Sequence, residues 1–343
     1  LREAVTACPK EPSLWLWFAK EKWNAGDLPG ARKIIEEAYQ HNPQSEEIWL
    51  AASRIEKESE EYDLARKLLQ RAREFCNTAR VWMKSALLER ECGNLEGERA
   101  LLVEGLKHFP KFPKLWLMLA QLHERTGARE EAKKTYMEAI SKVPSCSPLW
   151  IGLARLEEKM TGPSKARAIL DQARLKNPKK DELWLEAVRV EQRAGNNTMA
   201  SNLLAKGLQE IPDSGLLWAA RIEMEPKPTR RARGFDALKA NESDARIFLA
   251  VARLFWEDRK INKARFWFQR AVEQDPSFGD AWANWYKFEV QHGTEEQAKN
   301  VLQRAVATEP RHGEKWVAVS KDPKNHKMKT EQILKAVAAT VTI

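Results

Sequence analysis

The sequence predicts an all-α fold: a right-handed α-α superhelix, or solenoid, of about nine helix-turn-helix repeats. Three observations support this prediction. Tryptophans recur about every 34 residues along most of the 343-residue chain, a proline precedes most of them by six residues, and small residues follow them at two fixed positions. A fixed period of this length is typical of proteins whose repeats bury their apolar faces only against neighbouring repeats.

The aromatic residue of each repeat marks its first helix, here called helix A. The interval from one to the next is constant, apart from two shorter ones, from Trp49 to Trp82 and from Trp218 to Phe248. Because these residues recur in register with small residues, we interpret them as packed core rather than as platforms for stacking bases. The predicted core aromatics are Trp15, Trp49, Trp82, Trp116, Trp150, Trp184, Trp218, Phe248, Trp282 and Trp316.

The second helix, helix B, is marked by two small residues that share one face and allow a neighbouring helix to come close. They stand at two fixed positions after the tryptophan, as Ala31 and Ala38 do after Trp15. Glycines between the helices predict left-handed caps that end helix A: Gly26, Gly93, Gly127, Gly162, Gly195 and Gly293. Cys76 and Glu242 replace the proline before Trp82 and Phe248, which predicts irregular connectors there.

A glutamate stands seven residues after the tryptophan in six repeats: Glu56, Glu89, Glu157, Glu191, Glu225 and Glu289. Tetratricopeptide repeats share the period, the tryptophan, the alanines and the proline, but usually have a tyrosine at this position. With phrases such as Trp150–Glu157 and Ala65–Ala72, the chain resembles the HAT (half-a-TPR) repeat family over nearly its whole length. That resemblance implies a scaffold of RNA-processing machinery.

Breaks in the pattern divide the chain into five predicted segments. Residues 1–9 are expected to end a truncated preceding repeat, and residues 10–225 form regular repeats. Residues 226–244 form a shortened, irregular repeat half, since two prolines there interrupt helical hydrogen bonding. Regular repeats resume over 245–320. Residues 321–343 are expected to form a basic loop, with Lys321, Lys324, Lys327 and Lys329, and a capping helix from Thr330 to Val341.

Two sets of basic residues are candidate partner-binding sites. The first lies five residues after the helix A aromatic: Lys20, Arg54, Arg155, Arg189, Arg253 and Lys287. By analogy with tetratricopeptide repeats this position faces the concave side, so we expect a basic inner stripe; helix solubility is the alternative explanation. The second set is the basic cluster Lys227, Arg230, Arg231 and Arg233, which is either a seat for phosphate or an acidic helix, or a solvated helix start.

Five tryptophans lie outside the register: Trp17, Trp23, Trp256, Trp267 and Trp285. We interpret them as candidates for exposed anchors at a partner interface.

The sequence lacks the motifs of common catalytic sites. The sequence contains no glycine-rich phosphate loop, HExxH, GxSxG or paired-cysteine ligand set. We therefore predict a protein that is not an enzyme and that has no cofactor, metal ion, small-molecule substrate or membrane contact. The formal net charge of +9 is compatible with RNA or acidic protein surfaces.

The phrases Glu11–Lys20 and Asp280–Glu289 carry a closer resemblance, to the repeat region of a scaffold of the spliceosomal tri-snRNP. It implies a non-catalytic protein of the nucleus, in splicing speckles, that bridges snRNP proteins during tri-snRNP assembly. Two alternatives remain open: a HAT scaffold of another complex, such as mRNA 3′-end cleavage, and direct RNA contact through the basic stripe, which would be steeply salt-dependent.

Overall fold

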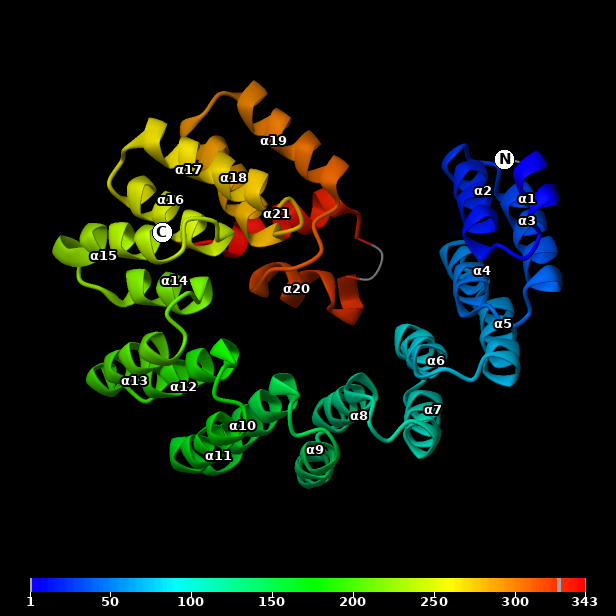
Figure 1. Ribbon diagram of the computed structural model, residues 1–343, viewed down its shortest axis with the longest axis horizontal. Helices are drawn as coiled ribbons and strands as arrows, with labels where there is room; N and C mark the ends of the chain where they lie inside the picture. The colour runs from blue at the N-terminus through cyan, green and yellow to red at the C-terminus, as the bar shows by residue number, and fades with distance from the viewer. Residues whose placement is uncertain (1, 326–327, 343) are drawn as a thin grey trace. The chain divides into compact units, whose positions relative to one another are not determined.

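The chain is described by a computed structural model that covers residues 2–325 and 328–342 (Figure 1). These residues form 21 α-helices and one 3-10 turn, so the predicted all-α stack of helix pairs is confirmed. Nine complete pairs are present among them. The chain divides into two compact units, Leu1–Leu149 and Trp150–Ile343, and each is described by itself.

Unit 1 begins with the short helix α1 (Arg2–Ala7), followed by four helix pairs in which consecutive helices pack on one another. The pairs are α2 (Pro12–Asn24) with α3 (Leu28–His41), α4 (Glu46–Glu58) with α5 (Tyr62–Phe75), α6 (Ala79–Glu91) with α7 (Leu95–His108), and α8 (Pro113–Arg125) with α9 (Arg129–Lys142).

Unit 2 contains five pairs and a C-terminal segment; the boundary between the units falls inside α10. The pairs are α10 (Ser147–Thr161) with α11 (Pro163–Lys176), α12 (Asp181–Arg193) with α13 (Asn197–Glu210), α14 (Gly215–Met224) with α15 (Lys227–Ala240), α16 (Ala245–Glu257) with α17 (Ile261–Gln274), and α18 (Gly279–His292) with α19 (Glu295–Thr308). The segment comprises α20 (Glu314–Ser320), the turn η1 (Pro323–Asn325) and α21 (Thr330–Thr340). Lys327 of the predicted basic loop lies outside the described residues.

A hydrogen bond fixes most helix A tryptophans to the connector before them. In at least six repeats the indole Nε1–H donates, at 2.7–3.1 Å, to the carbonyl oxygen of the proline six residues earlier: Trp15, Trp49, Trp116, Trp184, Trp218 and Trp282. Trp82, whose proline slot holds Cys76, donates instead to Oδ1 of Asn77 at 2.8 Å. Phe248 has no N–H to donate, and its connector lacks the proline. The constant spacing of proline and tryptophan therefore reflects this hydrogen bond between the indole N–H and the proline carbonyl oxygen.

The indoles also explain the small residues of helix B. Eight of the ten in-register aromatics are at most 8% exposed, while Trp184 and Trp218 are half-buried. A Cβ atom at Gly105 would lie 3.1 Å from the Cβ of Trp82 and 3.3 Å from Cδ1 of Leu115. The second small position is thus enclosed between the tryptophan of its own repeat and a leucine of the next, where a larger side chain would overpack.

The turn between helices A and B places one residue in the left-handed region. Gly26, Gly93, Gly127 and Gly195 have φ between 74° and 79° there, as predicted. Gly162 also has a positive φ, of 94°, but its ψ of 179° is extended, and it is the N-cap of α11. Gly293 is a correction: its φ is −97°, because the side chain of Thr294 caps α19 directly. In two repeats without a glycine at this slot, Glu60 (φ 64°) and Arg259 (φ 56°) adopt the left-handed conformation, which the sequence did not reveal.

Repeat seven is shortened in its first helix. Helix α14 has ten residues where the other A helices of complete pairs have 13–15, whereas α15 has 14 residues like the other B helices. The structure therefore places the deletion before Pro226, not within 226–244. Pro226 is the N-cap of α15 and Pro228 lies in its first turn, where no backbone N–H is needed, so the prolines begin this helix and do not interrupt it.

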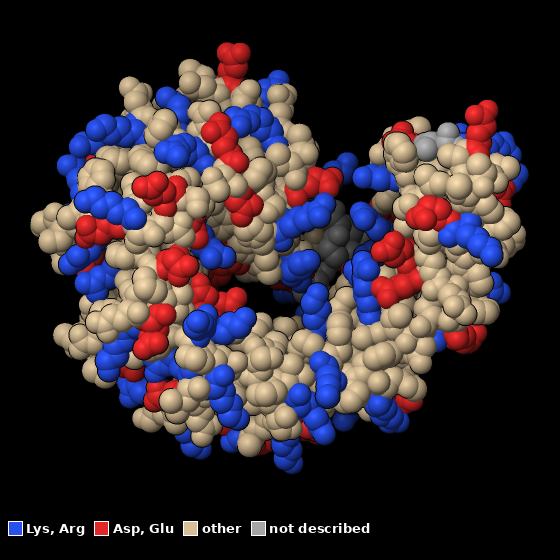
Figure 2. Space-filling view, viewed as in Figure 1, with Lys and Arg blue, Asp and Glu red and all other residues tan. Residues whose placement is uncertain are grey.

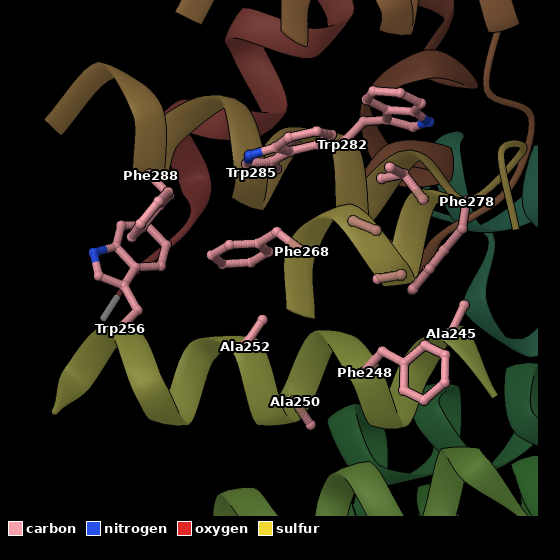
Figure 3. Packing of buried hydrophobic residues seen from close by; sticks show 14 of the residues in the cluster. Ala245, Phe248, Ala250, Ala252, Trp256, Phe268, Phe278, Trp282, Trp285 and Phe288 are labelled. Carbon is pink, nitrogen blue, oxygen red and sulfur yellow. The ribbon is translucent and has the colours of Figure 1, made fainter. Parts of the chain in front are cut away.

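Two of the five out-of-register tryptophans are core residues, contrary to the prediction. Trp256 is 3% exposed and packs edge-on against Phe288, with ring centroids 5.5 Å apart; Trp285 is 5% exposed and stacks on Trp282 at 5.8 Å (Figure 3). Both belong to an apolar cluster in which the A helices α16 and α18 bury residues on more than one face. Trp23 and Trp267 are half-buried, and Trp17 is 57% exposed. None of the helices formed by described residues has the length and apolar character of a membrane span.

The substitution Trp116→Phe tests the tryptophan seat. It removes the bond to Pro110 and part of the buried indole, and we expect the free energy of unfolding to fall by about 1–3 kcal/mol. Trp17→Phe is the control and should change stability by less than about 0.5 kcal/mol, because Trp17 is largely exposed. Urea denaturation followed by circular dichroism measures both; equal effects would contradict the proposed importance of the seat.

Replacing Glu60 with glycine tests the turn slot. A left-handed conformation costs a non-glycine residue about 1–2 kcal/mol, part of which is offset by the extra freedom of glycine in the unfolded chain. We therefore expect Glu60→Gly to raise the free energy of unfolding by about 0.5–1 kcal/mol. Gly195→Ala, at φ 78°, should lower it by a similar amount. A destabilised Glu60→Gly variant in the same denaturation assay would show that Glu60 is not strained at this slot.

Candidate functional site

Four of the six in-register glutamates are bound by arginines of the preceding repeat. In four repeats an arginine of helix B donates two hydrogen bonds to the glutamate of the next helix A, 23 or 24 residues further on. The N–O distances of these bonds lie between 2.5 Å and 3.3 Å. The pairs, which we call the Arg–Glu ladder, are Arg32–Glu56 and Arg66–Glu89 in unit 1, and Arg167–Glu191 and Arg265–Glu289 in unit 2.

The ladder glutamates are buried, at 2–7% exposure, and their bidentate partners replace the water that burial removes. The hydrogen bond from Arg167 holds the pKa of Glu191 below its usual value, although burial acts to raise it. The sequence showed the glutamates but not their function. Each ladder arginine directly follows the first small residue of helix B, so the constant spacing was the available signal.

In unit 1 the expected basic stripe remains accessible. Lys20 is exposed, and Arg54 has a side chain 68% exposed that pairs with Glu58 at 2.8 Å and lies over the ring of Trp23. Between α2, α4 and α6 the surface formed by the A helices is hollowed into a groove of about 590 Å³. Its lining includes Leu16, Leu50 and Leu87 together with the basic Arg54, Lys57, Arg80 and Lys84 and the acidic Glu47, Glu58 and Glu91.

In unit 2 the chain itself engages the stripe. Arg155 binds Glu186 with two hydrogen bonds of 2.6 and 3.0 Å, and Arg189 binds Glu314 of α20 at 2.5 and 2.6 Å. Burial raises the pKa of Glu186, but Arg155 and Arg193 outweigh this effect and lower the pKa overall. Arg253 pairs with Glu223 at 2.6 Å. Lys287 donates to the carbonyl oxygen of Val341.

The basic cluster of repeat seven is largely neutralised. Arg230 pairs with Glu257 at 2.5 Å, Arg231 donates to Asp258 at 2.6 Å, and Arg233 bonds both Glu225 and Asp236. Lys227 is exposed. Three of the four cations thus hold α15 against the end of α16 and the preceding turn. Figure 2 likewise shows acidic and basic side chains interspersed over the drawn face of each unit.

Nothing in the described part of the chain resembles a metal centre: no three His, Cys, Asp or Glu side chains gather there at a distance suited to an ion.

Comparison with known proteins identifies the repeat class. Tetratricopeptide-repeat profiles match residues 23–88 and 113–156. The chain is 69% identical over 277 residues to the protein STABILIZED1 of Arabidopsis thaliana, a match that covers 81% of this chain and 27% of the relative. It is 52% identical over 115 residues to human pre-mRNA-processing factor 6, covering 34% of this chain and 12% of the relative.

The chain contains tetratricopeptide repeats and is homologous to pre-mRNA-processing factor 6 and to STABILIZED1. The pre-mRNA-splicing factor prp1 of Schizosaccharomyces pombe is also similar, at 42% identity over 31% of this chain and 12% of that protein. The chain spans about a quarter of the length of STABILIZED1. The finer assignment to the HAT class stays a prediction.

The pH dependence of stability tests the ladder at Glu191. The folded pKa of this carboxylate lies below the unfolded value of about 4.3, so its stabilising contribution is complete above that value and is lost as the pH falls through the folded pKa. Glu191→Gln should cost about 1–3 kcal/mol at pH 7, and the difference from the unmodified protein should shrink below about pH 4.

Urea midpoints measured between about pH 3 and 7 follow this difference. The matched control is Glu210→Gln, because Glu210 is exposed near the end of α13. A cost of Glu191→Gln that stays constant with pH would show that shape rather than charge holds the pair.

Proposed function

We propose that the chain is a non-catalytic scaffold of pre-mRNA splicing that bridges snRNP proteins during assembly of the tri-snRNP in the nucleus, including splicing speckles. The main support is its similarity to proteins named pre-mRNA-processing factor 6 and pre-mRNA-splicing factor prp1. Stacked helix pairs offer long surfaces for protein contacts.

The docking surface in this proposal is the accessible A-helix face of unit 1. Lys20 and Arg54 are exposed beside the groove of α2, α4 and α6. Aliphatic residues together with charged residues in its lining are typical of a protein interface, in which apolar contacts supply affinity and charges supply orientation. The basic cluster at Arg230 is left out, because its ion-paired arginines have side chains only 20–49% exposed, against 68% for Arg54.

Direct RNA binding through the basic stripe is the weaker candidate. Five of its six members have a carboxylate or carbonyl partner within the chain: Arg54, Arg155, Arg189, Arg253 and Lys287. A phosphate backbone would have to displace these partners before it could release the counterions that drive nucleic-acid binding.

Affinity purification from nuclear extract, with mass spectrometry, tests the proposed function. We expect the chain to enrich snRNP proteins, and the enrichment should survive RNase treatment because protein contacts carry it. Lys20→Glu combined with Arg54→Glu should reduce the enrichment several-fold. Lys206→Glu with Lys299→Glu, on exposed positions of B helices, is the charge-matched control and should not.

Failure to enrich any splicing protein over a bead control would overturn the proposed function. Enrichment that RNase abolishes would instead assign the contact to RNA.

A further inference from the structure

Helix α21 lies in a seat formed by the last complete repeat. It packs on α18 and α19 as well as on α20 (Figure 1). Its buried face consists of Leu334, Val337, Ala338 and the C-cap residue Val341, each at most 6% exposed. The intervals of three, four and seven residues are those of an amphipathic helix that lays one face into a groove. The apolar cluster below includes Tyr286 of α18 and Leu302 of α19.

Three cations from three other helices donate hydrogen bonds to backbone carbonyl groups at the C-terminal end of α21. The carbonyl oxygen of Thr340 accepts from Lys315 of α20 at 3.2 Å, and that of Thr342 accepts from Arg253 of α16 at 3.1 Å. The carbonyl oxygen of Val341, between them, accepts from Lys287 of α18. Thr340 is the last residue of α21, whose last turn has no basic residue, so Lys315 supplies the positive charge that this terminal carbonyl group attracts. Lys287 and Arg253 bind the two residues that follow the helix.

Helix α21 departs from the sequence pattern of an ordinary second helix. It follows α20 where helix B of a tenth repeat would stand, but Gln332 occupies the position of the first small residue. Helix α20 has seven residues, of which Trp316 alone is buried, against 13–15 for most A helices. Helix α21 is therefore held chiefly by the face of the preceding repeat, to which it is tethered through residues 321–329.

We propose that this seat is a helix-docking site that the chain occupies with its own α21, and that a partner protein's helix of the same chemistry displaces it. The competing helix carries aliphatic residues at the same intervals and ends directly after them. If it ends in a free carboxylate, Lys287 and Arg253 gain charge-assisted hydrogen bonds that the neutral carbonyl groups of Val341 and Thr342 do not provide.

Tethering makes α21 a strong competitor. A segment joined by a short connector acts at an effective concentration on the order of millimolar, so an untethered helix binds weakly while α21 is seated. Weakening the apolar face of α21 should therefore open the seat without altering the residues that form it. The docking site belongs to unit 2 and does not depend on the proposed role in splicing.

The test uses the full chain with Leu334→Asp and Val337→Asp, and as probe a fluorescein-labelled peptide of residues 329–342 with a free C-terminal carboxylate. In fluorescence anisotropy the peptide should bind this variant at least about tenfold more tightly than the unmodified chain. Adding Arg253→Ala and Lys287→Ala should weaken binding about tenfold, and an amidated peptide should bind less tightly than the free acid. A peptide carrying Leu334→Asp is the negative control.

Circular dichroism and thermal denaturation establish that the variant is folded. A folded variant that does not bind the peptide would show that α21 is a permanent cap and would overturn the proposal. Loss of cooperative folding in the variant would also overturn the proposal, because it would show that the repeats do not stay folded when α21 leaves its seat. In the unmodified chain, hydrogen exchange of residues 330–341 should be faster than that of α18, and equal protection of the two helices would also count against displacement.

Discussion

The bond between the indole N–H of helix A and the carbonyl oxygen of the preceding connector is the constraint on which the repeat depends. It joins a residue inside a helix to the irregular chain that links two repeats, so it fixes where the connector ends and how deeply the indole enters the stack. Once the indole is placed, the facing position of helix B has no room for more than a small side chain, as the surroundings of Gly105 and Gly207 show. A connector that satisfies a buried donor also avoids the cost of an unpaired indole.

The Arg–Glu ladder adds direction to this packing. The tryptophan seat determines how each repeat meets its own connector, whereas each ladder pair crosses from one repeat to the next, as Arg167 does in reaching Glu191. A buried glutamate is costly without its arginine, so a neighbouring repeat that lacked the cation would leave an uncompensated charge. The ladder therefore favours one register of neighbouring repeats over others. Contact between apolar faces alone would not select that register.

The fold could be predicted from the sequence because its determinants are periodic. An aromatic residue at the same place in each repeat and a glycine at most turns report local requirements that every repeat must meet. The errors arose where a requirement was met by a different residue or by residues distant in sequence. Glu60 adopts the left-handed turn without being glycine, and Trp256 becomes core because of Phe268 on α17 and Phe288 on α18. The positions of the basic stripe followed from the repeat register, but its partners did not: Glu314 lies 125 residues from Arg189.

The end of unit 2 shows how a departure from the repeat depends on two residues at the start of α18. Asp280, at the start of α18, is buried and accepts hydrogen bonds from the backbone N–H groups of Lys315 and Trp316, which makes it an external cap for α20. Burial raises the pKa of this carboxyl, although the N–H groups act to lower it. Because Gly279 leaves space for the ring of Trp316, α20 begins directly against α18. Its short length then lets the chain return early, so that α21 covers the face of the ninth repeat that a regular tenth repeat would have covered.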